Sequence, residues 1–505
     1  MGQRKASLVL NPHGGQNLAK LAEMLAVLSA AGWKTRLAIK LYGGHAQKLA
    51  RKAAEQGADL LIAYGGDGTL NQVVNGAISA DYAGLIGVIP GGTANVWATE
   101  VGVPSDAVKA ALTLVNSVAR PVDVGHVEVT ALAGSALASG APAVSNGDTA
   151  EKKPKKRKSK TRQHFLLMAG LGIDAAVMGA VSQPLKYRLG PVAVGLAAAK
   201  ELPKHHPFPL ELRRVAGSND EVLWSGKALQ VVIGNSRLYA GVVEMTPNAV
   251  IDDGLLDVCI ITAGDPLTSL QQIVSLLLRH SPNQVTAEYF QGAHLALRVP
   301  ASISLQVDGS AVKLKDYLSR AQRQTLQEAQ NLAEVMVTYQ FDALPRALRL
   351  AIPHDHNAAL FQQEPAESDV PRDEAAAQER EAPSLEQPPP AEAANAGQAA
   401  FQGMQKHPEL VKALLEQGQK VKVTGASPHP EKKNTFILAG TSVSQKTGKV
   451  KPVAIVFNEE TALVRSSGEK IPPASVQLLK EGQEVVVGGK QKNKWGVIYA
   501  TYVLV

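Results

Sequence analysis

Residues 62–76 read "IAYGGDGTLNQVVNG", and the loop GGDG stands between an apolar run and a stretch with helical spacing. The apolar run predicts a buried strand, and the spacing after the loop predicts a helix. A tight turn needs one glycine or two, so the third glycine indicates main-chain amides left open for a ligand. The segment therefore predicts the strand–loop–helix unit of an α/β fold.

The same alternation extends over residues 1–120. Strand-like runs lie at 6–12, at 34–41, before the GGDG loop and in "LIGVIPGG", and helical runs lie at 17–32 and 44–57. Both helical runs stop at a glycine, which is typical of a helix end. For residues 1–120 we expect an α/β domain built on a parallel sheet with helices on its faces.

The sequence pattern changes beyond residue 120. Residues 121–345 hold closely spaced strand-like runs, interrupted by helical stretches at 184–201 and near 267–280, and predict a second, β-rich domain. An Ala/Gly/Ser- and then Lys-rich insert at 131–163 is expected to be disordered. Residues 362–400 are an acidic Pro/Ala-rich linker, and 401–505 predict a helix followed by a small β-barrel module of unknown role.

Composition narrows the class of protein. The 505 residues hold a single cysteine, Cys259, so an intrachain disulfide is excluded and a reducing compartment fits. We find no apolar run long enough to span a bilayer and no signal-peptide core, which predicts a cytoplasmic protein. The net charge of +7 is uneven, since residues 151–164 carry eight Lys/Arg against one Glu. Nucleic-acid binding does not follow from that net charge alone.

Three glycine loops follow predicted strands: "NPHGG" (11–15), "GGDGT" (65–69) and "PGGTAN" (90–95). Glycine lets a phosphate approach the backbone, and a helix start offers unpaired amides. A carboxylate such as Asp67 repels a neighbouring phosphate unless a metal ion or a transferring proton lies between them. Asp67 therefore indicates bound Mg²⁺ or acid–base catalysis. Each loop alone is compatible with an ordinary βα turn. Together they predict one phosphate site at the carboxyl ends of the strands.

These loops carry a resemblance to a known family. "GGDGTLNQVVNG" and "PGGTANVWA" resemble the catalytic domain of the diacylglycerol kinase family, in its bacterial lipid-kinase branch. "MAGLGIDAAV" (168–177), "PLKYRLGPVAV" (184–194), the segment 232–258 and "LQVDGS" (305–310) follow in the family's order, so the resemblance covers about residues 1–345. A GGDG loop alone is also found in NAD kinases.

The resemblance implies a lipid kinase / NAD kinase-like fold: an ATP-binding α/β domain, then a β-sandwich, with the additional C-terminal barrel outside it. It also implies ATP and Mg²⁺ as cofactors. By position, the nucleotide would be held by Asn11, Gly15, Gly65, Gly66, Asp67, Gly68, Thr69, Leu70, Asn71, Thr93 and Asn95.

The stretch "VIDDGLLD" (250–257) resembles the family's structural metal site. The carboxylate of Asp253 and the main-chain carbonyls of Val250 and Leu255 would then hold Mg²⁺, which prefers oxygen ligands. From spacing alone, "DDG" is more typical of a hairpin turn than of a metal site.

The match departs from the family at the predicted catalytic triplet. The family carries Asp-Gly-Glu where this chain has Asp308-Gly309-Ser310, and the glutamate is taken as the base for the acceptor hydroxyl. A serine cannot serve as that base. Asp308 or Asp67 is therefore the predicted catalytic base; the other readings are a low rate, or a protein that binds and does not catalyse. Lys40, where the family often has threonine, could pair with a phosphate or lie in solvent.

The sequence therefore predicts an ATP- and Mg²⁺-dependent lipid kinase of phospholipid metabolism. Its acceptor would be diacylglycerol or a sphingoid-type lipid, met at an anionic membrane surface to which the protein binds peripherally. The alternatives are a catalytically impaired nucleotide- or lipid-binding protein and, within the kinases, a soluble acceptor. For 401–505 nucleic acid is a lesser alternative to a soluble β-module, resting on its lysines with Trp495 and Tyr499 as stacking faces.

Overall fold

The computed structural model describes most of the chain outside the predicted insert and linker. The described residues are 4–12, 20–134, 163–172, 207–216, 220–239, 243–262, 287–329, 331–362, 419–430, 432–443, 450–459, 461–465, 467, 469–491 and 497–505. The helices predicted at 184–201, 267–280 and 401–417 lie outside these residues, as does nearly all of the insert 131–163 and of the linker 362–400.

The N-terminal part confirms the predicted parallel α/β arrangement. Its elements are β1 (Lys5–Leu10), α1 (Leu21–Ala30), β2 (Lys34–Ile39), α2 (His45–Glu55), β3 (Leu60–Gly65), α3 (Asp67–Ile78), β4 (Leu85–Pro90), α4 (Val96–Glu100) and α5 (Ala107–Val115). The four strands are parallel neighbours in the order β4-β3-β1-β2. Alternate residues of β1 serve different cores, with Val9 facing α2 and α3 and Leu8 facing α1 and α5.

The described residues of the second part lie mostly in strands. They are β5 (Val118–Gly134), β6 (His164–Phe165), β7 (Met168–Gly172), β8 (Phe208–Arg214), β9 (Glu221–Gly234), β10 (Leu238–Tyr239), β11 (Val243–Glu244), β12 (Leu256–Thr262), β13 (Ala287–Gly292), β14 (His294–Pro300), β15 (Leu305–Val307), β16 (Ser310–Val312) and β17 (Val335–Ile352). The helices among its described residues are the short η4 (Leu314–Asp316), α10 (Arg320–Glu328) and η5 (Ala358–Leu360).

Two long strands join the first two parts. β5 and β17 pair antiparallel along most of their length, and the end of β17 then pairs parallel with β4, with Arg349 opposite Leu85. Fifteen described strands thereby form one hydrogen-bonded sheet. The predicted domain limits at 120 and 345 fall inside β5 and β17, so the chain crosses between the parts within continuous strands.

The C-terminal part confirms the predicted barrel. Its elements are β18 (Gln419–Pro428), β19 (Phe436–Val443), β20 (Val450–Phe457), β21 (Ala462–Val464), η6 (Pro473–Leu478), β22 (Glu484–Gln491) and β23 (Val497–Leu504). The strand order is β20-β19-β18-β22-β23-β21, and an additional β20–β23 pairing closes the sheet on itself. No described helix is long and apolar enough to cross a membrane.

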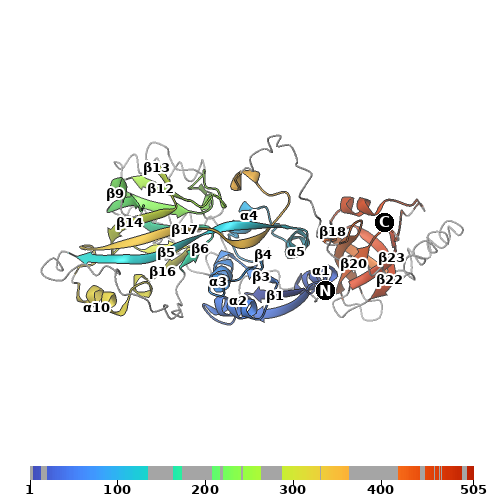
Figure 1. The fold of residues 1–505 in the computed structure, drawn as a ribbon. Helices are drawn as coiled ribbons and strands as arrows, with labels where there is room; N and C mark the ends of the chain where they lie inside the picture. The colour runs from blue at the N-terminus through green and yellow to red at the C-terminus, as the bar shows by residue number, and fades with distance from the viewer. Residues whose placement is uncertain are drawn as a thin grey trace, which may run out of the picture.

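The barrel packs directly on the N-terminal part (Figure 1). One hydrophobic core contains Met24 of α1 and Leu112 of α5 together with Ala439 and Val456 of the barrel. The ring of Tyr499 packs against this same core, so it is not a free stacking face, and Trp495 lies outside the described residues.

Polar contacts surround this shared core. Thr424 Oγ1 bonds to Glu23 Oε2 at 3.2 Å, and Lys109 Nζ lies 2.6 Å from Glu481 Oε2. Figure 1 shows the three parts in a row, with α1 and α5 between the parallel sheet and the barrel.

Candidate active site

The three predicted glycine loops begin at the carboxyl ends of neighbouring strands. Because β1, β3 and β4 are parallel neighbours, their loops leave the sheet at one edge. Main-chain bonds tie the loop starts together, with Asn11 N donating to Tyr64 O at 3.0 Å and Gly91 N to Gly65 O at 3.1 Å. Gly15, in the first loop, lies outside the described residues.

The glycines of two loops are required by close packing. A Cβ at Gly92 would lie 2.4 Å from the Cα of Gly66, and a Cβ at Gly65 would lie 2.5 Å from Thr69 Oγ1. Gly66 caps the N-terminus of α3, whose first amides have no partner within the helix. The two backbones therefore meet with no side chains between them, at a helix start suited to a phosphate.

Asp67 joins the same two loops. Its Oδ1 accepts a hydrogen bond from Trp97 N at 3.1 Å, at the start of α4. The Asn95 side chain brackets Gly92, accepting from Gly92 N at 2.8 Å and donating to Gly92 O at 3.0 Å. Burial raises the pKa of the Asp67 carboxyl above its ordinary value, although amides at the start of α4 oppose this.

The remaining residues that were predicted to bind the nucleotide differ in their exposure to solvent. Gly66, Asp67 and Gly68 are half-buried and Thr93 is exposed. Thr69, Leu70 and Asn71 are 2, 3 and 0% exposed, so their side chains point into the protein. Their contact with a nucleotide stays a prediction, and in this arrangement it would be made by the main chain.

Asp308 lies at the boundary between the first and second parts. It begins the two-residue turn between β15 and β16, where Asp308 and Gly309 have φ of 44° and 68°, the left-handed pair favoured in tight hairpins. The Asp308 side chain is 4% exposed. Oδ2 accepts from Asn71 Nδ2 at 2.8 Å and Leu166 N at 3.1 Å, and Oδ1 accepts from Leu167 N at 3.0 Å and Met168 N at 3.1 Å.

Those four bonds occupy the lone-pair directions of the Asp308 carboxylate. Burial raises the pKa of Asp308 to about 6, although these same hydrogen bonds favour the charged form. An ionised Asp308 holds Asn71 of α3 against the turn at residues 166–168 of the second part. Ser310 follows on β16, opposite Val307, and is half-buried.

The sequence reading missed a polar row that reaches this boundary. Across the neighbouring strands β14, β17, β5 and β6, His294, Asp342, His126 and His164 occupy one register row. His294 Nδ1 lies 2.8 Å from Asp342 Oδ1, His126 Nδ1 lies 3.7 Å from Asp342 Oδ2, and the rings of His126 and His164 lie 5.0 Å apart. Burial alone would raise the pKa of Asp342, but its interactions with His126, Gln340 and His294 lower that pKa to about 2.

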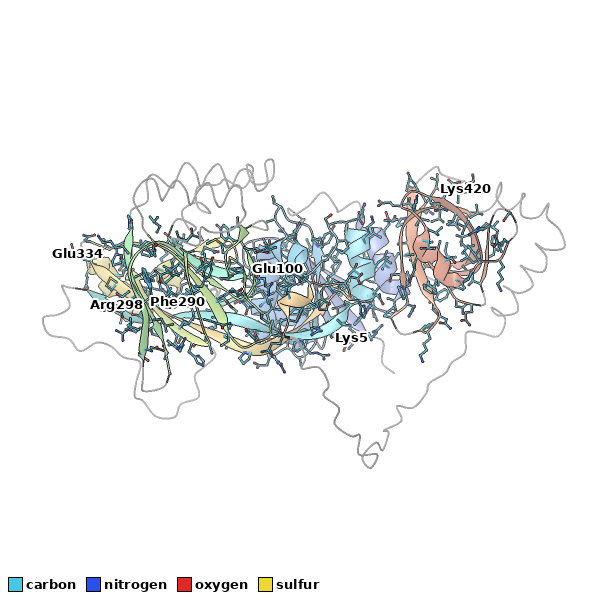
Figure 2. All side chains as sticks on the ribbon, turned by 90° about the horizontal axis from the view of Figure 1, so that it is seen from above. Lys5, Glu100, Phe290, Arg298, Glu334 and Lys420 are labelled. Carbon is cyan, nitrogen blue, oxygen red and sulfur yellow. The ribbon has the colours of Figure 1, made fainter. Side chains whose placement is uncertain are left out.

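His164 connects this row to α3. Its Nδ1 lies 3.1 Å from Asn75 Oδ1, and its main-chain oxygen accepts from Asn71 Nδ2 at 2.8 Å and Asn75 Nδ2 at 3.0 Å. The spacing of Asn71 and Asn75, one helical turn apart, was the available signal. A second contact across the boundary is made by Glu100 Oε1, which accepts from Arg237 N at 2.6 Å; Figure 2 shows Glu100 near the middle of the molecule.

The state of His164 gives a testable pH dependence. Burial, and then the charge of His126, lowers the pKa of His164 from 6.5 to about 3. Its contribution to the free energy of unfolding is present above pH 6.5 and is lost as the pH falls from 6.5 towards about 3. We expect the His164 Cε1–H resonance to stay at its neutral position at pH 5, and His164→Gln to flatten the acid limb of the stability curve.

The wild type and His164→Gln must be compared, because Asp308 changes the free energy of unfolding with pH in the opposite direction to His164. Its pKa is raised from 3.8 to about 6, so its contribution to stability grows as the pH falls through that window. A His164 resonance that titrates near pH 6.5 in the folded protein would contradict the predicted state.

The predicted metal residues lie in the turn before β12. Asp253 Oδ1 accepts from Leu255 N at 2.9 Å, and the buried Asp123 accepts from Gly254 N at 2.5 Å. Burial raises the pKa of Asp253, and the charges of Asp123 and Asp252 raise it further. Among the described residues no three His, Cys, Asp or Glu side chains are grouped to hold a metal. A cation here would thus need main-chain oxygens as well, and the crowded carboxylates fit a divalent cation.

We expect Mg²⁺ to raise the thermal midpoint of unfolding and Asp253→Asn to remove most of that increase. A cation that binds the folded chain stabilises it by mass action, about 2.7 kcal/mol at a hundredfold excess over Kd. Asp220→Asn, at an exposed position outside the turn, is the matched control and should keep the full response. Equal Mg²⁺ responses in Asp253→Asn and in the wild type would count against a site at this turn.

Comparisons with known proteins cover the first two parts. Residues 5–127 match the family model described as diacylglycerol kinase catalytic domain, and residues 168–327 match the YegS C-terminal NAD kinase beta sandwich-like domain. Neither match includes the barrel.

The chain is 29% identical over 310 residues to the diacylglycerol kinase of Bacillus subtilis (strain 168), covering 61% of this chain and 89% of that protein. It is 32% identical over 271 residues to a "Probable lipid kinase YegS-like" of Pseudomonas fluorescens, covering 53% and 76%. A crystal structure from Bacillus anthracis str. Sterne, described as a candidate diacylglycerol kinase, has a TM-score of 0.50 at 19% identity. It covers 71% of this chain and 97% of its own, and it supports the fold.

Proposed function

Since the chain belongs to the diacylglycerol kinase family of lipid kinases, we propose that it transfers the γ-phosphoryl group of ATP, with Mg²⁺, to the hydroxyl of a lipid. The acceptor would be diacylglycerol or a sphingoid-type lipid, both of which offer a hydroxyl at the polar end of an apolar molecule. The protein would meet it from the cytoplasm at an anionic membrane surface, without spanning the bilayer.

The observation that carries the proposal is the bond between Asn71 and Asp308. Asn71 lies in the first turns of α3, directly after the GGDG loop, and Asp308 begins the hairpin that bears Ser310. The bond places a turn of the β-rich part against the helix whose N-terminus would hold the phosphates. A donor and an acceptor bound on the two sides of this boundary would be held in one geometry, and positioning is the main contribution to phosphoryl transfer.

The residues then take distinct parts in the reaction. The amides of Gly66 and Gly68, with Thr93 on the facing loop, would bind the phosphates. Mg²⁺, when bound, neutralises charge on the transferring phosphoryl group. Asp67 holds the two loops together through α4. The predicted base role of Asp67 or Asp308 stays a prediction, and the four hydrogen bonds to Asp308 favour a positioning role for it.

A second candidate is a protein that binds nucleotide or lipid and transfers nothing. Ser310 stands where the family has glutamate, and the nearby Asp308 carboxylate is already occupied by donors. Transfer of labelled γ-phosphate from ATP to a mixed-lipid extract separates the two candidates, and chromatography of the product identifies the acceptor. ATP binding with no labelled lipid would favour the binding protein.

We expect Ser310→Glu to raise the rate of phosphoryl transfer, roughly tenfold or more, because it restores a carboxylate able to accept the proton of the acceptor hydroxyl. Ser310→Ala should leave the rate close to that of the wild type, since serine does not serve as that base. The measurement is kcat with a detergent-solubilised lipid acceptor. A wild-type rate that falls strongly in Ser310→Ala would instead assign the serine hydroxyl a direct part.

A further inference from the structure

Large apolar side chains are exposed along the edge strand β2 and the loop after it. Leu37, Ile39, Leu41 and Tyr42 are 38, 44, 72 and 51% exposed, and we call these four residues the β2 stripe. They are four of the ten large hydrophobic side chains that are exposed in the described part of the chain. β2 is the last strand of its sheet, and alternation along it puts Leu37 and Ile39 on one face. Such a concentration marks an interaction surface.

The stripe lies in a strongly basic segment. Residues 34–52 contain six Lys/Arg and no Asp/Glu. Some of these side chains also make local contacts: Arg36 donates to Gln56 Oε1 at 2.9 Å, and Arg51 pairs with Glu55 at 3.1 Å. Even so, the segment presents apolar side chains among cationic ones, which suits an anionic surface with an apolar interior.

The loop that carries Tyr42 is preformed. Tyr42 stacks on the His45 ring, with centroids 4.4 Å apart, and Lys48 Nζ lies 5.1 Å from the Tyr42 ring centre and 3.2 Å from its hydroxyl. The amide of Leu41 donates to His45 Nδ1 at 3.1 Å. These contacts fix the loop on the first turn of α2, so binding would not have to order it.

The stripe adjoins the candidate active site. Ile39 lies opposite Leu10 in the parallel sheet, and Lys40 N donates to Leu10 O at 2.8 Å. Leu41 and Tyr42 therefore leave the sheet at the same edge as the loop at Asn11. A surface that covered the stripe would lie beside the phosphate loops.

We propose that the β2 stripe docks on an anionic lipid bilayer, with Leu41 and Tyr42 among the headgroups and Lys48 and its basic neighbours against the phosphates. The inference rests on the proposed function, because a lipid acceptor brings the enzyme to such a surface. A second copy of the chain is a poorer occupant: a two-fold contact through this patch sets its cationic side chains against their own copies.

The test is co-sedimentation of the full chain with phosphatidylcholine vesicles, with and without phosphatidylglycerol. We expect binding only to the anionic vesicles, weakening with added salt, and a drop in partitioning of about tenfold or more in Leu41→Ser combined with Lys48→Glu. Val222→Ser combined with Lys227→Glu likewise replaces an apolar side chain by serine and a lysine by glutamate, at exposed positions of β9, and should bind as the wild type does.

Activity on a detergent-solubilised lipid keeps this test separate from that of the proposed function. The Leu41/Lys48 variant should keep its rate on the solubilised lipid and lose rate on vesicles. Unchanged vesicle binding in that variant would overturn the docking surface, as would a wild-type dimer that Leu41→Ser converts to a monomer with vesicle binding intact. Normal vesicle binding without transfer to any lipid would refute the kinase and leave the docking surface standing.

Discussion

Gly92→Ala is expected to lower the rate of phosphoryl transfer about a hundredfold, the cost of a displacement of about 1 Å in a positioned site. The new methyl carbon would lie 2.4 Å from Gly66 Cα and 3.0 Å from Gly66 N. These are backbone atoms, so no side-chain rotation relieves the contact and the two loops must separate. The fold should survive, because overpacking of this kind costs about 1–3 kcal/mol.

The measurement is kcat/KM for ATP beside a denaturant curve for the same protein. Gly43→Ala is the matched control, since a Cβ at Gly43 meets no atom within 4 Å. A Gly92→Ala protein with normal kcat/KM would show that the close approach of the loops has no part in nucleotide binding.

Asp308→Asn is expected to destabilise the protein by about 3–5 kcal/mol and to abolish transfer. The substitution keeps the shape of the side chain and replaces one acceptor oxygen by an NH2 group. In one orientation that group meets Asn71 Nδ2 and Leu166 N, and in the other it meets Leu167 N and Met168 N. Either way a donor faces two buried donors, and breaking a buried charged network costs about that much.

Both denaturant unfolding and transfer activity should be followed for this variant. Asp355→Asn makes the same chemical change at an exposed position and should alter neither. If Asp308→Asn folds with wild-type stability yet transfers no phosphate, the carboxylate acts on the substrate rather than on the boundary, and the predicted base role gains support.

The sheet and its loops were predictable because their signals are local. β3 and β4 are apolar runs that end in glycine, and an apolar strand followed by a glycine loop and a helix has few structural alternatives. The position of each loop at one sheet edge then follows from parallel strand order alone. Thus the loops that contain Gly65, Gly66 and Gly92 could be placed at one edge of the sheet from the sequence alone.

The parts of the site that the sequence did not reveal depend on distant pairings. Asn71 and Asp308 are 237 positions apart, and their bond depends on how the turn between β15 and β16 meets α3. The row from His294 to His164 exists only because four strands meet in one register, which single-strand patterns do not specify. Likewise, the spacing of the apolar residues of α1 does not reveal whether the helix packs on the parallel sheet alone or on the sheet and the barrel together.

The packing of the barrel on α1 and α5 affects how the molecule responds to ligands. Since the barrel and the N-terminal sheet bury one core through α1 and α5, they should lose their structure in one cooperative transition. By linkage, a ligand of the folded barrel should raise the melting temperature of the glycine loops, and a nucleotide bound at those loops should protect the barrel equally. We therefore expect removal of the barrel, residues 419–505, to destabilise the N-terminal part. Truncation at the linker would leave the apolar outer faces of two helices in water.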